Sequence, residues 1–196
     1  MFLTYYVESL GLPSTPVVFM KRRLPPISFL LYAALAIFVG VIVAYSAGIR
    51  FTLTPSMPIG LYRLVDEPLA KGAMVTFCPP AWAADFALER GYLHRGPCNG
   101  GTEPLGKYIL AVPGDTLVAR PEGLTLNGKV IPASAIHFRD RLGRELMHLP
   151  FGQHVIGPDS LFLFSGHHPR SFDSRYFGAV PRSSIISSLY PLWTTE

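Results

Sequence analysis

Charged residues are scarce in this sequence, and cysteine is nearly absent. Asp, Glu, Lys and Arg make up 15% of its 196 residues, whereas hydrophobic residues make up 49%. A typical soluble domain has about 25% charged residues, and a disordered chain has few apolar ones, so the composition excludes disorder as the main state. Only two cysteines are present, and no C-x-x-C pair occurs. The chain is therefore neither a disulfide-framework mini-protein nor a zinc finger.

The small excess of positive charge gathers at one place. The formal net charge is +4. Residues 1–49 carry the basic run 21–23 (KRR) against Glu8, and Arg50 adds one further positive charge. From residue 51 onward, 13 basic residues face 12 acidic ones. The length suits one domain with an appendage, and that domain has no charge excess of the kind that binds nucleic acid.

One long segment has no charged side chain. It covers residues 27–49 (ISFLLYAALAIFVGVIVAYSAGI), a run of 23 residues. That length spans a bilayer core with some tilt, and it exceeds the apolar part of a cleaved secretory signal, which has about 7–15 residues. A buried core helix is the alternative, but such helices rarely run about six turns without a polar face. We predict that 27–49 is a transmembrane signal anchor.

The charges that flank the anchor predict its orientation. The run 21–23 precedes it, whereas only Arg50 follows it closely. By the positive-inside rule the N-terminus faces the cytoplasm. We expect a cytoplasmic tail over 1–26 and a single pass through the cytoplasmic (inner) membrane. Residues 50–196 then form a periplasmic, extracytoplasmic domain.

The residues after the anchor predict a mainly β domain. Short apolar stretches alternate there with Pro and Gly, which is typical of antiparallel β proteins with many turns. An Asn-Gly pair at 127–128 is the strongest short hairpin signal in the chain. The one helical pattern, 81–90, lies in an insertion, 79–104. The predicted strands are 61–65, 74–77, 116–120, 124–126, 129–131 and 160–164.

The two cysteines lie near the ends of that insertion. Cys78 directly precedes it, and Cys98 lies six residues before it ends. Both belong to the part of the chain that we expect outside the cytoplasm, where thiols tend to be oxidised. We predict a Cys78–Cys98 disulfide that closes most of the insertion. Two unpaired thiols are the alternative.

Two short segments carry side chains suited to nucleophilic chemistry. Ser56 lies between Pro55 and Pro58, and these prolines restrict the backbone in a way that suits a fixed, exposed hydroxyl. Lys107 opens an apolar run that ends in Pro-Gly-Asp at 113–115. Among apolar neighbours a lysine loses hydration, and its pKa falls. Taken singly, each segment also fits a plain structural role.

A third, polar segment covers 165–178 and follows the last predicted strand. The order of the three segments resembles the signal peptidase family of membrane-anchored Ser/Lys proteases. In both, an anchor is followed by Ser-Met-Pro at 56–58, by Lys107 with its Pro-Gly-Asp, and by Ser-x-Asp-Ser-Arg at 171–175. The resemblance implies coiled antiparallel sheets after one transmembrane helix, and a serine endopeptidase activity.

One branch of that family is more similar than the others. The runs 56–62 (SMPIGLY) and 171–178 (SFDSRYFG) resemble the TraF-type peptidases of conjugative plasmid transfer. General signal peptidases usually carry Gly-Asp-Asn where this chain has Gly-His-His at 166–168. This departure favours the TraF-type branch over a housekeeping signal peptidase.

The resemblance also implies roles for individual residues. Ser56 would be the nucleophile and Lys107 the general base, since a hydroxyl attacks a carbonyl only when a neighbouring group takes its proton. Asp173 matches an acidic position that TraF-type enzymes need. A carboxylate in contact with Lys107 would keep the amine protonated, so we expect Asp173 to act through Arg175 or the loop backbone.

Two further residues complete the expected site. Ser171 matches the serine that orients the lysine in signal peptidases. The amide of Ser56 and the hydroxyl of Thr54 are candidate donors to the oxyanion of an acyl-transfer reaction. His167 and His168 are adjacent and have no carboxylate pair nearby, so we predict no metal site, and no cofactor is expected.

The resemblance implies an exported, membrane-inserted precursor as the substrate, specifically a conjugative pilin, cut with or without cyclisation. The expected partners are this precursor, the lipid bilayer and the conjugation machinery. Two alternatives stay open: a general signal peptidase, and a membrane-anchored assembly protein without activity. A self-cleaving repressor also uses a Ser-Lys dyad, but it needs a DNA-binding domain. The charged stretch 139–145 is expected to be a solvated segment.

Overall fold

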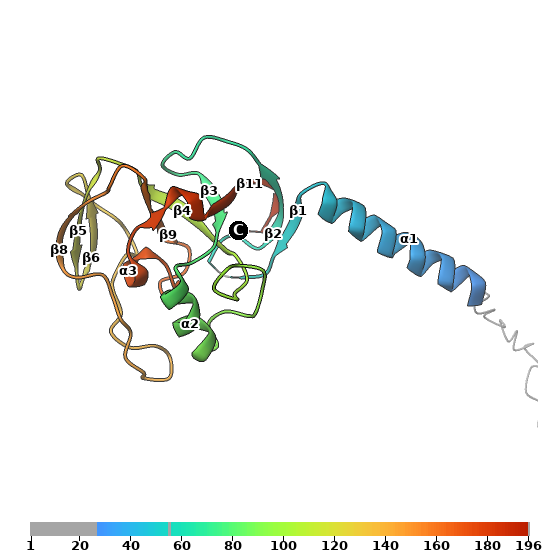
Figure 1. Cartoon of the computed structure of the whole chain (residues 1–196), viewed down its shortest axis with the longest axis horizontal. Helices are drawn as coiled ribbons and strands as arrows, with labels where there is room; N and C mark the ends of the chain where they lie inside the picture. Colours follow the sequence, from blue (N-terminus) through green and yellow to red (C-terminus); the bar gives the residue numbers. More distant parts are fainter. Residues whose placement is uncertain (1–26, 55, 196) are drawn as a thin grey trace, which may run out of the picture. The chain divides into compact units, whose positions relative to one another are not determined.

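The computed structural model describes residues 27–54 and 56–195 (Figure 1). Its first element is the helix α1 (Ile27–Ser46), which has no buried side chain. An 18-residue window of this helix has a mean hydropathy of 2.7, so by length and composition it can cross a membrane. The expected tail, 1–26, lies outside the described residues.

The helix is three residues shorter than the predicted anchor, 27–49. The helix ends at Ser46, and the chain turns at Gly48, whose φ is 81°. Glycine adopts this left-handed conformation without the steric cost that a side chain brings. The chain then enters strand β1 (Ile49–Thr52), in which Ile49 pairs with Arg63. The end of the apolar run is therefore part of the β domain.

Seven strands form one sheet in the order β1-β2-β11-β3-β4-β9-β10. All the neighbouring pairs are antiparallel. The C-terminal strand β11 pairs with β2 on one side and β3 on the other, so it joins the first strands to the rest of the sheet. The strands are β2 (Gly60–Val65), β3 (Met74–Phe77), β4 (Leu105–Ala111), β9 (Ser160–Phe164), β10 (Val180–Pro181) and β11 (Ile185–Thr194).

A second, four-stranded sheet has the order β7-β6-β5-β8. Asn127 and Gly128 connect β6 to β7 with φ values of 48° and 81°, as a two-residue hairpin turn requires. The predicted Asn-Gly hairpin is present, and the mainly β class is confirmed. The strands are β5 (Thr116–Arg120), β6 (Gly123–Leu126), β7 (Lys129–Val130) and β8 (Gly152–Val155).

Strand β4 carries a lysine into the interior of the domain. Its residues alternate between buried and partly exposed, and Leu105, Lys107, Ile109 and Ala111 lie on the buried side. Successive side chains of a strand point to opposite faces, so the position of Lys107 between Leu105 and Ile109 directs its side chain inward. Leu105 and Ile109 belong to the larger core, which β3, β9 and the insertion helix also build.

The insertion is held to the domain at two points. Its helix α2 (Ala81–Glu89) buries Ala83, Ala84 and Ala87. The predicted Cys78–Cys98 disulfide is present in the structure, with 5.5 Å between the Cα atoms. The ring of Phe86 stacks on Phe172, with 6.1 Å between the centroids and 16° between the planes. The insertion thus contacts the polar loop that follows β9.

Several elements were not expected from the sequence. Strand β11 has no clean alternation of buried and exposed residues, and it contains Ser187, Ser188 and Pro191. Its place between β2 and β3 depends on partners more than a hundred residues away, which a local pattern does not reveal. Within the polar loop, the short helix α3 (Ser174–Phe177) is fully buried. A single 3₁₀ turn (Arg182–Ser184) precedes β11.

The disulfide gives a first testable prediction. A Cys78→Ser/Cys98→Ser variant should lose about 3 kcal/mol of unfolding free energy, because the bridge closes a loop with a sequence separation of 20 in the unfolded chain. The measurement is denaturant unfolding of the full chain in detergent, followed by fluorescence of its two tryptophans. Added reductant should destabilise the wild type and leave the double-serine variant unchanged. Equal midpoints for the oxidised wild type and the variant would contradict the prediction.

Candidate active site

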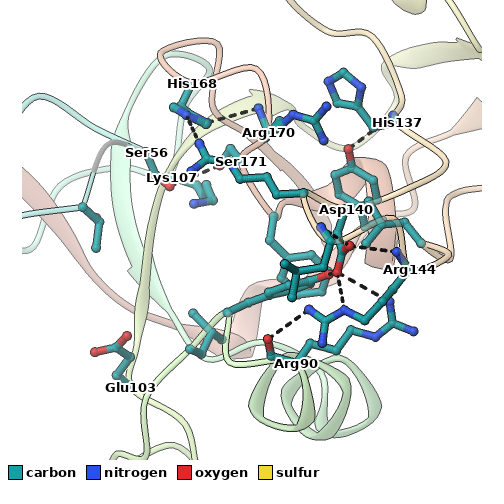
Figure 2. A pocket seen from close by; sticks show the side chains of 18 residues that line it. Ser56, Arg90, Glu103, Lys107, His137, Asp140, Arg144, His168, Arg170 and Ser171 are labelled. Carbon is teal, nitrogen blue, oxygen red and sulfur yellow. Dashed lines mark hydrogen bonds and ion pairs between the residues drawn. The ribbon is translucent and has the colours of Figure 1, made fainter.

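Ser56 and Lys107 line the same cavity, which has a volume of about 510 Å³ (Figure 2). Thr54 and Ser171 line it as well. The remaining walls come from the end of the insertion helix, the loop between β7 and β8, and the loop after β9. The cavity therefore brings together all three segments that the sequence analysis singled out.

A turn before β2 positions Ser56. The amide of Met57 donates to the carbonyl of Thr54 over 3.5 Å, and the Met57 side chain is 2% exposed. Met57 packs against Gly106, where an added Cβ would lie only 2.5 Å from the methionine Cε. Because Gly106 directly precedes Lys107 in β4, this contact sets the serine turn beside the lysine.

Two other serines fix Ser56. The Ser171 hydroxyl donates to Ser56 Oγ over 3.2 Å, and the Ser165 hydroxyl donates to the Ser56 carbonyl. Ser165 is fully buried at the end of β9, and Ser171 is 3% exposed. The side chain and the backbone of Ser56 are thus each held by a separate hydrogen bond from the polar loop.

Lys107 is the buried basic group of the site, with 1% of its surface exposed. Burial lowers the pKa of its amine from 10.5 to about 8; the nearby Asp173 opposes this shift, and Arg175 adds to it. In the part of the chain that the structure describes, no hydrogen bond links the amine to Ser56 or Ser171. Such bonds are often long in a site without substrate and shorten when it binds.

Asp173 and Arg175 form a fully buried ion pair. Nε of Arg175 donates to one carboxylate oxygen over 2.8 Å and Nη2 donates to the other over 2.9 Å, so the pair is bidentate. The carboxylate also caps α3 by accepting from the Arg175 amide, and it accepts from the Ser165 amide over 3.3 Å. Asp173 therefore contacts Arg175 and the loop backbone, the two connections expected for it.

Arg175 fastens the loop that carries Ser171. Its guanidinium donates to the carbonyls of Ser171, Pro169 and Ala135 over 3.0, 3.1 and 2.8 Å. A chain of contacts thus runs from Arg175 through Asp173 and Ser165 to the carbonyl of Ser56. Ser165 is the first residue of the polar segment 165–178, but it lies outside the motif 171–175, so the resemblance assigned it no role.

The structure adds detail to three expectations. The Ser171 hydroxyl, which we expected to orient the lysine, donates to Ser56 Oγ. Thr54 is exposed and lines the cavity, which leaves it accessible as a donor. The stretch 139–145 is solvated only in part: Arg139 and Glu145 pair at the surface, whereas Asp140 is bound by the Tyr92 hydroxyl over 2.5 Å. Isolated charge alternation could not show that this stretch forms a cavity wall.

Comparison with known proteins agrees with these motifs. The family model described as signal peptidase, peptidase S26, matches residues 23–193. The chain belongs to this family. The resemblance read from the three motifs is therefore confirmed, and membership supports a peptidase-like function.

Relatives at the sequence level are TraF proteins. The chain is 38% identical over 151 residues to the plasmid transfer protein TraF of Escherichia coli, covering 76% of this chain and 85% of that protein. It is 41% identical over 164 residues to the conjugal transfer protein TraF of Agrobacterium tumefaciens (strain 15955), covering 81% and 91%. A solved signal peptidase I from Enterococcus faecalis V583 aligns with a TM-score of 0.38 at 16% identity, covering 64% of this chain and 100% of that one.

The buried ion pair of this S26 peptidase site gives a second prediction. Asp173→Asn should lower the unfolding free energy by about 3–5 kcal/mol, because it leaves the Arg175 guanidinium buried without its counter-charge. Asp159→Asn, at an exposed carboxylate, is the matched control and should stay within about 0.5 kcal/mol of wild type. Denaturant unfolding of the full chain measures both. An Asp173→Asn variant as stable as the control would show that the pair does not hold the loop.

Proposed function

We propose that the chain is a membrane-anchored serine endopeptidase in which Ser56 and Lys107 form a Ser/Lys dyad that processes an exported precursor. The observation that carries the proposal is the common cavity of the two residues, in which burial lowers the pKa of the Lys107 amine to about 8. At pH 7 such an amine is neutral about one time in ten, against less than one in a thousand for an ordinary lysine.

The chemistry follows from these two groups. Ser56 Oγ attacks the scissile carbonyl while the neutral Lys107 amine takes the hydroxyl proton. The ammonium then gives that proton to the leaving amine as the peptide bond breaks, and an acyl-enzyme remains on Ser56. Attack by water releases a free carboxylate, whereas attack by the amine of the precursor's own N-terminus releases a cyclic product. Both outcomes restore Ser56 and Lys107.

The developing oxyanion needs donors near Ser56. The Ser56 amide and the Thr54 hydroxyl are the proposed pair. The exposure of Thr54 at the cavity supports its assignment. Asp173 and Arg175 are proposed as positioning residues, since their contacts reach Ser56 through Ser165 and Ser171.

The membrane and the substrate belong to the same proposal. The apolar helix α1 and the basic run 21–23 support one pass through the cytoplasmic membrane, with the β domain on the periplasmic side. Ser56 follows the end of α1 by ten residues, so the chain tethers it within about 36 Å of the helix end. The transfer-protein names of the relatives support a conjugative pilin precursor as substrate and the conjugation machinery as partner.

The proposal predicts that either member of the dyad is indispensable. Co-expression of the full chain with candidate pilin precursors should yield shortened products, scored by intact mass, with a further loss of water if cyclisation follows. Ser56→Ala and Lys107→Met should each reduce processing at least about a thousandfold. Lys129→Met, at an exposed lysine of β7, is the matched control and should process normally.

Two other results of this experiment would each support one of the alternative functions. Normal processing by both dyad variants would contradict the protease proposal and favour an assembly protein without activity. Dyad-dependent removal of leaders from many unrelated precursors would favour a general signal peptidase.

A further inference from the structure

Positively charged side chains outnumber carboxylates in the cavity beside Ser56. Five cationic side chains line it, against two carboxylates. The carboxylates are Asp140 and Glu103, and the Glu103 carboxylate accepts from the His94 amide over 3.3 Å. In Figure 2, Glu103 lies on the opposite side of the opening from Arg170. The cations are Lys107, Arg90, Arg141, Arg144 and Arg170.

Asp140 is already engaged by its neighbours. Its carboxylate accepts from the Tyr92 hydroxyl over 2.5 Å and from Arg144 Nε over 2.6 Å, and Arg90 Nη1 lies 4.0 Å away. Burial opposes its ionisation, but these hydrogen bonds hold the pKa of Asp140 well below its ordinary value. Asp140 is thus ionised, and its single negative charge is engaged by Arg144 and Arg90. It forms no ion pair with the other two arginines.

Arg141 and Arg170 have no carboxylate partner among the described residues. Both are exposed. Arg141 Nη2 lies 3.2 Å from His168 Nε2, and the Arg170 amide donates to His168 Nδ1 over 3.1 Å. A neutral imidazole accepts through only one nitrogen, so His168 cannot satisfy both donors. One guanidinium N–H of Arg141 therefore competes with a backbone amide for a single acceptor.

The rest of the wall is apolar. Leu93, Leu142, Leu146 and the ring of Phe172 line the cavity next to these arginines. A ligand that fits both features has an apolar side chain and a nearby carboxylate. A guanidinium binds a carboxylate with two parallel hydrogen bonds, which gives orientation as well as affinity.

We propose that this cavity selects the peptide substrate through a carboxylate that binds Arg141 and Arg170, with an adjacent apolar side chain on the leucine wall. The inference rests on the proposed peptidase function and names its substrate class: acidic peptide segments. The carboxylate comes either from an Asp or Glu side chain or from the free C-terminus of the segment to be released. The two sources share the same chemistry at the arginines.

The test measures binding, so that it does not depend on the chemistry at Ser56. Full-length Ser56→Ala protein in detergent micelles is immobilised and incubated with a randomised hexapeptide library, prepared once as free acids and once as C-terminal amides. Retained peptides are identified by mass spectrometry. The same measurement is made with Arg141→Gln/Arg170→Gln added, and with Arg120→Gln added as a matched control at an exposed arginine of β5.

The proposal predicts about tenfold enrichment of peptides that carry the bound carboxylate over otherwise matched peptides that lack it. Enrichment of Asp and Glu in both library forms identifies a side chain, and enrichment of free acids regardless of sequence identifies the C-terminus. Either preference should vanish in Arg141→Gln/Arg170→Gln and persist in Arg120→Gln. No enrichment, or an enrichment that survives loss of both cavity arginines, would overturn the inference. The dyad variants test the peptidase function separately, so the two failures are distinguishable.

Discussion

The structure depends on the burial of one amine. Lys107 occupies an inward position of β4, between two core side chains, where an ordinary strand would place another aliphatic residue. Moving an ammonium group out of water costs free energy. Burial therefore favours the neutral amine, and the pKa of the group falls. The two charges that act on it, Asp173 and Arg175, shift that pKa in opposite directions and are paired with each other. The lowered pKa of the amine is thus a consequence of the fold.

The surroundings of Lys107 serve to keep this arrangement fixed. The Asp173 carboxylate is engaged by Arg175, so its charge is largely compensated within the pair. The same pair holds the loop whose serines bind Ser56. The insertion stacks on this loop through Phe86 and Phe172, and the disulfide anchors the insertion to the end of β3. Strand β4 and the polar loop thus contact the turn of Ser56 directly, and the insertion supports the polar loop.

Short sequence patterns predicted the helices, strands and turns that are specified by interactions between residues close in the sequence. The Asn-Gly hairpin, strand β9 and helix α2 appear within a residue of their expected bounds, because turn chemistry and side-chain periodicity specify them. The family motifs located Ser56, Lys107 and Asp173. Local patterns did not predict strand β11, the bond from Ser165 to Ser56 or the cationic cavity wall. Each of these depends on residues that are distant in the sequence. The strand that begins at Ile49 was also missed, because its first residue continues the apolar run of the predicted helix.

The central claim is that Lys107 is a low-pKa amine next to Ser56. The chain has only four lysines, so ¹⁵N-lysine labelling gives few Nζ signals, and Lys107→Met identifies the relevant one by its disappearance. The most direct test is an NMR titration of that signal in the full-length protein in detergent. The account predicts deprotonation with a pKa of about 8, with the amine protonated below and neutral above that pH. A signal that titrates near the ordinary lysine value of about 10.4 would contradict it.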